Sequence, residues 1–284
     1  MRTERLSLLQ FDSPWWFLPG VIRLVRPPGC SSAAEARRRL LNNELRQPYI
    51  LETTSERRLH FTLAAVQSAM SLDEPHALIL PYTRKMMTFL LFNPNPKHVV
   101  MLGLGGGSLP KFCHHHLPQT QITVVEIDAD VIALRDEFCV PRNDRRFRIV
   151  HDDGEHYLSK LAKPVDVILI DAFNRTGAAP VLENPDFYVQ AAQRLSLNGV
   201  FAINLVGERA DCLPYIRRIR AAFGGSTLIL PTLAADNLLV FAFKTRTVLP
   251  TAAKYESRAR ILRAQLSLEF PRYLRRMHQG HILP

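Results

Sequence analysis

Short apolar runs alternate with stretches of helical spacing from residue 98 onward. The runs cover 98–102, 122–127, 147–151, 165–171 and 199–205, and two more, 226–230 and 238–244, follow close together. The early runs are almost continuously apolar, as expected for strands of a parallel sheet that helices cover on both faces. The short connection 231–237 predicts an antiparallel hairpin at the sheet edge. The pattern therefore predicts an α/β fold with a seven-stranded sheet.

A different pattern precedes residue 93. Residues 49–54 and 59–66 are rich in β-branched and aromatic side chains and flank a polar break, which predicts a hairpin in a small β domain. Residues 82–92 predict a helix that ends at the proline-rich segment 93–96, and residues 31–45 predict a short helix that begins at a serine cap. We expect a basic segment at 1–47, a small β domain with a linking helix at 48–92, an α/β domain at 93–245 and a basic C-terminal helix at 246–284.

The formal net charge of +10 is concentrated at the two ends of the chain. Residues 1–47 carry +4 and residues 244–284 carry +7, whereas the middle is nearly balanced at −1. Such ends could bind nucleic acid or another anionic surface. Aromatic residues are sparse among the arginines and no nucleic-acid-binding motif occurs, so solvated amphipathic helices are favoured. Residues 254–277 predict such a helix, which could equally pack on a dimer partner.

A glycine-rich turn, Gly103-Leu104-Gly105-Gly106-Gly107-Ser108, follows the first strand of the α/β domain. Glycines permit a tight turn and a close approach of the backbone to a ligand. Ser108 replaces the third glycine of the dinucleotide fingerprint, which argues against a nicotinamide cofactor. Glu126 ends the second strand, at the spacing where a carboxylate accepts both ribose hydroxyls of a nucleotide. We predict that Gly103, Gly105, Gly107 and Glu126 bind a nucleotide; the alternative for Glu126 is a solvated acid at a strand end.

Acidic residues also end the next two strands. Asp153 and Gly154 follow the third strand, and Asp171 ends the fourth. Ligands of open α/β sheets lie along these carboxyl ends. Asp153 is predicted to accept the adenine amino group, although a plain turn would use the same residues. Asp171 would face the reacting centre as a catalytic group, or would brace the loop that follows it.

Cysteines and histidines do not predict a metal site. The four cysteines are far apart and lack CxxC spacing, which indicates reduced thiols. Cys113 and His116 share a helical face, but the three histidines at 114–116 point about 100° apart, and a closed site needs four ligands. No apolar run approaches the roughly 20 residues of a membrane span, and residues 1–10 lack a signal-peptide core. We therefore expect a cytoplasmic protein without a membrane partner.

These motifs, in this order, resemble the spermidine synthase (polyamine aminopropyltransferase) family over about residues 48–245. The resemblance implies a small N-terminal β domain and a Rossmann-type, S-adenosylmethionine-dependent methyltransferase-like seven-stranded sheet, usually in a homodimer. It implies S-adenosylmethionine or its decarboxylated form as co-substrate at the glycine loop, and a small-molecule amine or other acceptor. The similar features are Val66-Gln67-Ser68 through Asp73-Glu74, Tyr82, Asn93-Pro94-Asn95-Pro96, the glycine loop, Glu126-Ile127-Asp128, Asp153-Gly154 and Pro231-Thr232. Gln67 then joins the nucleotide-binding residues, and Tyr82 would bind the acceptor.

Three positions depart from the family pattern. Gly106 stands where family enzymes have an aspartate in the glycine loop, and Thr83-Arg84 replace a His-Glu pair after Tyr82. Asn174 occupies the position of the catalytic aspartate, three residues beyond Asp171. Aminopropyl transfer requires removal of a proton from an ammonium group and carboxylates that hold a polycation. Asparagine cannot take that proton and arginine repels a diamine, so adenosine recognition is expected to persist while diamine recognition is reduced, with Asp171 as the alternative base.

Three functions fit these residues. The first is a transferase of the spermidine synthase type with altered acceptor use, which the resemblance favours. The second is a methyltransferase that uses S-adenosylmethionine itself, against which Met101 replaces the usual acid two positions before the glycine run. The third is a non-catalytic nucleotide-binding scaffold, because a fold alone does not establish catalysis.

Overall fold

The computed structural model describes residues 8–13, 20–25, 29–63, 65–174, 177–231, 237–245 and 253–279. The chain forms two compact units. The first comprises Met1–Ile79, Gly105–Phe112 and Asp128–Pro141, and the second comprises Leu80–Leu104, Cys113–Ile127 and Arg142–Pro284. In the described part of the chain, no helix has the length and apolar character that a membrane span requires.

The first unit contains a five-stranded antiparallel sheet in the order β1-β2-β3-β4-β5. Strands β3 to β5 confirm the predicted β domain, whereas β1 and β2 lie in a segment for which the sequence predicted only a helix. Ile22 and Leu24 are buried in β2 and their neighbours are more exposed, a period-two pattern that is too short to recognise in the sequence. The strands are β1 (Leu8–Asp12), β2 (Val21–Val25), β3 (Tyr49–Glu52), β4 (Glu56–Thr62) and β5 (Ala65–Ser71).

Helix α1 (Ala33–Leu41) packs in the first unit and confirms the predicted helix with a serine cap. The Ser32 hydroxyl accepts a hydrogen bond from the Glu35 backbone N–H (3.2 Å), and the Glu35 carboxylate accepts one from the Ser31 backbone N–H (2.9 Å). These two bonds form a reciprocal cap at the helix start. Ala36 and Leu40 lie on the buried side of α1, in one apolar cluster with residues of β2 and β3. The short helix α5 (Ala129–Ala133) also belongs to this unit.

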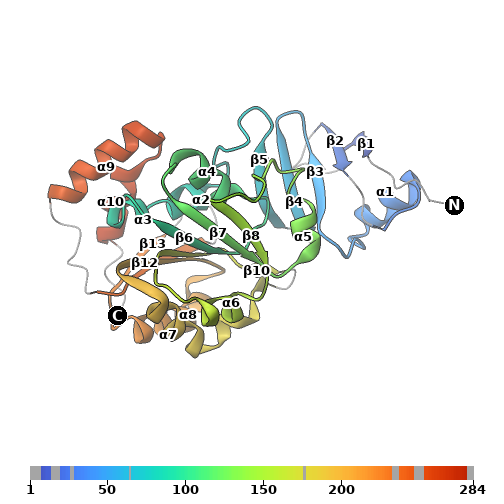
Figure 1. The fold of residues 1–284 in the computed structure, drawn as a ribbon. Helices are drawn as coiled ribbons and strands as arrows, with labels where there is room; N and C mark the ends of the chain where they lie inside the picture. Colours follow the sequence, from blue (N-terminus) through green and yellow to red (C-terminus); the bar gives the residue numbers. More distant parts are fainter. Residues whose placement is uncertain are drawn as a thin grey trace. The chain divides into compact units, whose positions relative to one another are not determined.

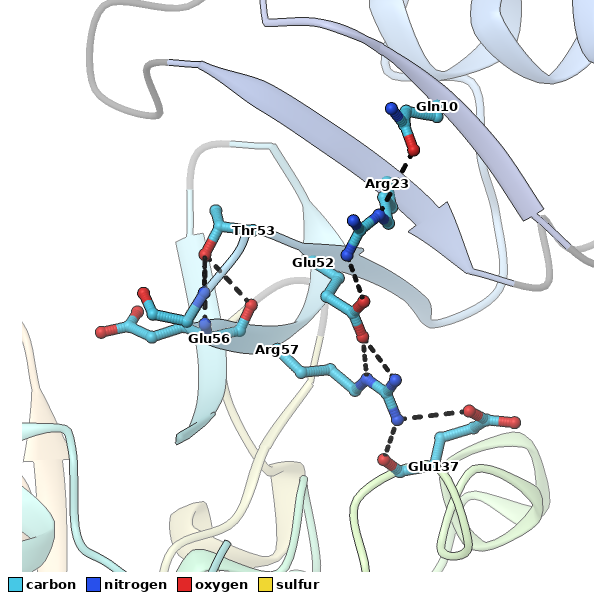
Figure 2. A network of polar contacts seen from close by, with 8 residues as sticks. Gln10, Arg23, Glu52, Thr53, Glu56, Arg57 and Glu137 are labelled. Carbon is cyan, nitrogen blue, oxygen red and sulfur yellow. Dashed lines mark hydrogen bonds and ion pairs between the residues drawn. The ribbon is translucent and has the colours of Figure 1, made fainter. Parts of the chain in front are cut away.

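A network of charged side chains connects three strands of this sheet (Figure 2). Glu52 on β3 is only 8% exposed, and it accepts hydrogen bonds from Arg23 on β2 (3.2 Å) and from Arg57 Nε on β4 (2.7 Å). Arg57 also donates to the backbone carbonyl and to the carboxylate of Glu137. The guanidinium of Arg57 therefore compensates the buried charge of Glu52 and fixes the position of Glu137.

Replacing Arg57 with methionine is expected to lower the free energy of unfolding by about 1.5–3 kcal/mol, because it leaves the Glu52 carboxylate largely buried with one fewer charged partner. Arg58→Met is the matched control, since Arg58 on the same strand pairs with the more exposed Glu56, and it should cost below about 1 kcal/mol. Urea unfolding followed by circular dichroism measures both. Equal losses in the two variants would contradict a special role for Arg57.

The second unit contains a seven-stranded sheet in the order β13-β14-β12-β9-β6-β7-β8. Strands β12, β9, β6, β7 and β8 run parallel to one another, and β14 is antiparallel to both β12 and β13. This topology confirms the predicted sheet with an antiparallel hairpin at one edge. The strands are β6 (His98–Leu102), β7 (Gln121–Glu126), β8 (Phe147–His151), β9 (Val165–Ile170), β12 (Leu195–Val206), β13 (Thr227–Pro231) and β14 (Asn237–Phe243).

Helices cover both faces of the seven-stranded sheet (Figure 1). Helices α6 (Gly154–Lys160), α7 (Pro185–Arg194) and α8 (Arg209–Ala222) pack on one face through a shared apolar core. Helices α2 (Pro81–Met86), α3 (Phe89–Phe92) and α10 (Phe270–Gln279) contact the other face. Three short elements follow β9 in the chain and precede α7: the two-residue strands β10 (Phe173–Asn174) and β11 (Gly177–Ala178) and the 3-10 helix η1 (Pro180–Glu183). Helix α4 (Ser108–His116) is divided between the units, since its residues up to Phe112 belong to the first and the rest to the second.

Two predicted helices are each divided in the structure. Residues 82–92 form α2 and α3, which are separated at Met87 and Thr88. The C-terminal segment forms α9 (Ala253–Leu266) and α10, and Ser267 adopts a left-handed conformation (φ 55°) between them. Leu268 and Phe270 near this break are buried. The break lets both helices bury an apolar side, which one straight amphipathic helix would not.

Candidate functional site

The turn after β6 requires glycine at its first position. Gly103 has φ 98°, and a Cβ atom there would lie 2.3 Å from the carbonyl oxygen of Asp171. The Asp171 backbone N–H donates to the Leu102 carbonyl (3.0 Å), so the ends of β6 and β9 are in direct contact. Gly103 therefore brings the start of the glycine loop and the start of the loop after β9 together.

Glu126 at the end of β7 fixes the direction of this loop. Its Oε2 atom accepts a hydrogen bond from the Leu104 backbone N–H (2.7 Å), and the Gly103 backbone N–H donates to the Val125 carbonyl (2.9 Å). Glu126 is 9% exposed, so it is not a solvated acid at a strand end. Its role toward ribose hydroxyls stays a prediction, which its position beside the loop favours.

Ile127 is a feature of this rim that the sequence reasoning missed. The residue directly follows Glu126 and is 66% exposed, although isoleucine is usually buried. The imidazole Nε2 of His151 lies 3.0 Å from its backbone carbonyl oxygen, which ties the ends of β7 and β8 together. An apolar residue between the two acids at 126 and 128 was the signal in the sequence.

Asp153 caps the helix that follows β8. Its Oδ1 atom accepts hydrogen bonds from the backbone N–H groups of Glu155 (2.9 Å) and His156 (3.1 Å) at the start of α6. The preceding Asp152 contacts the His156 ring (2.7 Å), and this hydrogen bond lowers the pKa of Asp152. A Cβ atom on Gly154 would lie 2.9 Å from the Leu102 side chain. Asp153 and Gly154 thus have structural roles, and adenine recognition by Asp153 stays a prediction.

Asp171 lies at the centre of a polar cluster at the carboxyl end of β9. The Tyr82 hydroxyl on α2 donates to Oδ2 of Asp171 (2.9 Å), and the Asn204 side-chain amide on β12 donates to Oδ1 (2.9 Å). Asn204 Oδ1 accepts in turn from the side-chain amide of Asn237 at the start of β14 (2.9 Å). The structure therefore brings the predicted residues Tyr82 and Asp171 together and adds Asn204 and Asn237, which the sequence did not indicate.

Burial raises the pKa of the Asp171 carboxyl above its usual range, and the hydrogen bonds from Asn204 and Tyr82 act in the opposite direction. Burial and the adjacent Asp171 carboxylate raise the pKa of Tyr82 well above its usual value, so this phenol stays a donor at neutral pH. A carboxylate with a raised pKa is a stronger proton acceptor than an ordinary aspartate. The cluster can therefore take a proton from a group that approaches this rim.

The residues that follow Tyr82 have distinct environments on α2. The Thr83 side chain is buried and donates to the Leu80 carbonyl (2.6 Å), whereas Arg84 is exposed. Lys85 is buried, and its ammonium donates to the Pro231 carbonyl (3.3 Å). Burial, together with nearby arginines on α10, lowers the pKa of Lys85 to about 8. This helix carries positive charge and no acid.

Three predicted nucleotide-binding residues, Gln67, Gly105 and Gly107, belong to the first unit. Gln67 is half-buried on β5, and its neighbour Ser68 bonds to the Ser108 hydroxyl (3.1 Å). A Cβ atom on Gly105 would lie 3.7 Å from the Ser68 Cβ. Strand β5 is thus in contact with the part of the glycine loop that belongs to the same unit.

Gly106 has no space for a larger side chain. A Cβ atom at Gly106 would lie 2.8 Å from both the Phe138 ring and the Ser68 hydroxyl oxygen. Phe138 is 1% exposed and cannot move into solvent without opening the core. The packing around this position therefore favours glycine.

Gly106→Asp is expected to lower the free energy of unfolding by about 1–3 kcal/mol, because the added side chain overpacks the space between Phe138 and Ser68. Gly106→Ala adds only the Cβ atom and should cost less. Thermal unfolding of the two variants and the unaltered chain measures the order. An aspartate variant as stable as the unaltered chain would show that the loop has room for an acidic side chain.

Asn174, the other predicted catalytic residue, belongs to β10, which pairs with β11 through Gly177. Its side chain lies outside the described residues, as does Thr232.

Cys113 does not form a ligand pair with His116: its thiol donates to the Met87 sulfur (3.8 Å), and burial raises its pKa to about 12. Cys113 is thus held as a protonated thiol in the core.

Comparison with known proteins links this geometry to one family. A family model described as the spermine/spermidine synthase domain matches residues 80–209. A polyamine aminopropyltransferase of Chromobacterium violaceum is 34% identical over 241 residues, which cover 82% of this chain and 92% of that protein. A corresponding protein of Neisseria meningitidis is also 34% identical, over 79% of this chain and 86% of its own length.

A solved structure also shows the likeness of the fold. A probable spermidine synthase from Corynebacterium glutamicum superposes with a TM-score of 0.63 at 20% identity, over 76% of this chain and 84% of that one. At this identity the superposition establishes the shared fold alone.

Proposed function

This chain belongs to the spermine/spermidine synthase family, and from that premise we propose that it transfers an aminopropyl group from an S-adenosyl-type nucleotide to an amine, with Asp171 as proton acceptor. One observation carries the proposal. The Asp171 carboxylate, held by Tyr82 and Asn204, supplies an acid at the reacting rim although residue 174 is asparagine. In this proposal, the transfer would not depend on an acid at 174.

The nucleotide would bind along the carboxyl ends of β6, β7 and β8. Glu126 would accept the ribose hydroxyls while it keeps its bond to the Leu104 backbone N–H. The exposed side chain of Ile127 would pack against the adenine ring, which removes apolar surface from water. The turn at Gly103 would bring the sulfonium end of the nucleotide toward Asp171.

The transfer step is a displacement at carbon. The acceptor ammonium first gives a proton to the Asp171 carboxylate, which leaves a neutral amine. The amine nitrogen then forms a bond to the carbon beside the sulfonium, and the carbon–sulfur bond breaks with its electron pair going to sulfur. The positive charge passes from sulfur to nitrogen, so the products are an alkylated ammonium group and a neutral thioether, and the proton on Asp171 is released to water. The Tyr82 and Asn204 donors would hold the carboxylate in place throughout.

We propose that the acceptor is recognised mainly at its reacting amine. The helix that carries Tyr82 also carries the exposed Arg84 and the buried Lys85, and cations beside an acceptor repel a second ammonium group. A diamine such as putrescine would therefore gain little over a monoamine of the same length.

Calorimetry and turnover assays test the proposal. Decarboxylated S-adenosylmethionine, S-adenosylmethionine and methylthioadenosine are titrated in turn, and putrescine and butylamine are then compared as acceptors. Binding of the decarboxylated nucleotide with formation of methylthioadenosine and an aminopropylated amine supports the proposal. Tight binding of S-adenosylmethionine with methyl transfer instead indicates a methyltransferase. Failure of all three nucleotides to bind leaves a non-catalytic scaffold and rejects the proposal.

We further propose a homodimer in the cytoplasm as the working form. The family resemblance motivates the dimer, and the cysteines of the described residues are free thiols, as suits a reducing compartment. The basic ends would then serve packing rather than nucleic acid. Light scattering gives the mass in solution, and the ratio of absorbance at 260 and 280 nm reports any nucleic acid that copurifies.

A further inference from the structure

Asn204 is an unusual residue for its place in the sheet. It is 2% exposed near the end of β12, where the flanking residues Ile203 and Leu205 belong to the apolar core. A buried side-chain amide has to find partners for its polar atoms, since leaving one unpaired costs free energy. Asn204 does so through two side chains, Asp171 and Asn237, each at 2.9 Å.

The sheet register places these three residues together. Ile203 pairs with Ile170 across the parallel β12–β9 ladder, so the next residue on each side, Asn204 and Asp171, are neighbours. Asn204 pairs with Leu239 on the antiparallel β14, and Asn237 is two residues earlier on that strand, on the same face. Diagonal cross-strand neighbours of this kind are within reach of each other's side chains.

Asn237 determines which end of the Asn204 amide faces Asp171. A primary amide has an acceptor oxygen at one end and a donor NH2 group at the other. The Asn237 amide donates to Asn204 Oδ1, which leaves the Asn204 NH2 group directed at the Asp171 carboxylate. A reversed amide would place its oxygen against the carboxylate and lose both bonds.

We propose that Asn204, oriented by Asn237, is a positioning residue that holds the Asp171 carboxylate in the orientation required to accept the proton of the acceptor amine. This inference rests on the proposed function. A carboxylate has about four lone-pair sites, and Asn204 and Tyr82 occupy one on each oxygen. The remaining lone pairs serve the acceptor, while the two donors prevent the carboxylate from rotating.

The surroundings of Asp171 make the effect of Asn204 measurable. Among the described residues, the side chains that shift the pKa of Asp171 are Tyr82 on α2, which is titratable, and Asn204 on β12, which is not; both donate to the carboxylate. The residue of the glycine turn that lies next to the Asp171 backbone is Gly103, which has no side chain and therefore no charge. Burial raises this pKa and the two hydrogen bonds lower it, so removal of the Asn204 donor should raise it further.

The test compares Asn204→Leu and Asn237→Leu in the full chain. The control is Thr123→Val, which removes a buried polar group of β7 that bonds to His98 and Arg148 and not to Asp171. Carbon-13 NMR follows the titration of the Asp171 carboxyl without substrates, and its signal is assigned by its loss in Asp171→Asn. The kcat and KM values of the transfer reaction are measured as a function of pH in parallel.

Asn204→Leu is expected to raise the titration midpoint of Asp171 by about one to two pH units, the equivalent of one hydrogen bond to a charged group. The kcat value should fall about 10- to 100-fold with little change in the nucleotide KM. Asn237→Leu should raise the titration midpoint of Asp171 and lower kcat as well, but by smaller amounts. This second variant keeps the test decisive if Asn204→Leu does not fold. Thr123→Val should shift neither.

An unchanged Asp171 titration in a folded Asn204→Leu or Asn237→Leu variant would overturn the inference, whatever the activity. A shifted titration with an unchanged pH profile and kcat would also overturn it, because the carboxylate would then be tied to Asn204 without a role in transfer. If the unaltered chain shows no transfer with any acceptor, the proposed function fails, and the titration separately reports whether Asn204 controls the carboxylate.

Discussion

Replacement of Asp171 with asparagine should reduce aminopropyl transfer by about two to four orders of magnitude, the usual contribution of a positioned general base. Asparagine has nearly the same shape and can still accept from Asn204, while its NH2 group can donate to the Tyr82 hydroxyl oxygen. The variant therefore removes the proton acceptor with little change in packing. Steady-state assays of methylthioadenosine formation measure the loss, and calorimetry should find nucleotide affinity nearly unchanged.

The pH profile gives an independent check on Asp171. Transfer should decline as the pH falls through the raised pKa of this carboxyl, since the protonated acid cannot accept a proton. The sign for stability is opposite. The folded chain binds this proton more tightly than the unfolded chain, so the stabilisation from protonation is complete below the usual carboxyl pKa and is lost as the pH rises through the folded value. The asparagine variant should lose both dependences.

Asp186→Asn provides the matched control for this experiment. Asp186 is an exposed acid in the first turn of α7 and takes no part in the cluster. Its replacement should leave transfer intact. If Asp171→Asn also retains full activity, Asp171 is not the base; restoration of activity by Asn174→Asp in the Asp171→Asn chain would show that position 174 still reaches the acceptor.

Replacement of Glu126 with glutamine should weaken binding of the S-adenosyl-type nucleotide about 10- to 100-fold, because the neutral amide cannot offer two charged acceptors to the ribose hydroxyls. The glutamine oxygen can still accept from the Leu104 backbone N–H, so the loop should keep its path. Glu126→Ala removes that bond as well and should bind more weakly still. Isothermal titration calorimetry with methylthioadenosine measures both.

The control for Glu126 is Glu256→Gln on the exposed side of α9. Its nucleotide affinity should equal that of the unaltered chain. Equal affinity in Glu126→Gln would remove this residue from the nucleotide site and limit it to holding the loop. If Glu126→Ala loses nucleotide affinity and Glu126→Gln does not, the loss is due to the missing hydrogen bond to the glycine loop and not to contacts with ribose.

The alternation of strands and helices in the second unit follows from the local pattern of apolar and polar residues. Apolar runs gave β6 and β8 their bounds, and the four residues of β6 after His98 are all buried, as expected for a strand that is covered on both faces. Glu126 and Asp171 could be identified because each ends such a run, and the carboxyl ends of parallel strands meet at one edge. These features depend on residues that are close together in the sequence, so they can be predicted without knowledge of the fold.

The identity of the polar groups that meet at this edge depends instead on how the strands are arranged in space. Asn204 is 33 residues from both Asp171 and Asn237, and its partners follow from the register of β12 with β9 and β14. An asparagine within an apolar run can either bond to a buried partner or face the solvent, and the sequence does not distinguish these two cases. The bend at Ser267 and the tight packing at Gly106 could not be predicted for the same reason. Both depend on contacts with segments that are distant in the sequence. Local periodicity defines the elements, whereas hydrogen bonds and packing between elements require their positions in space.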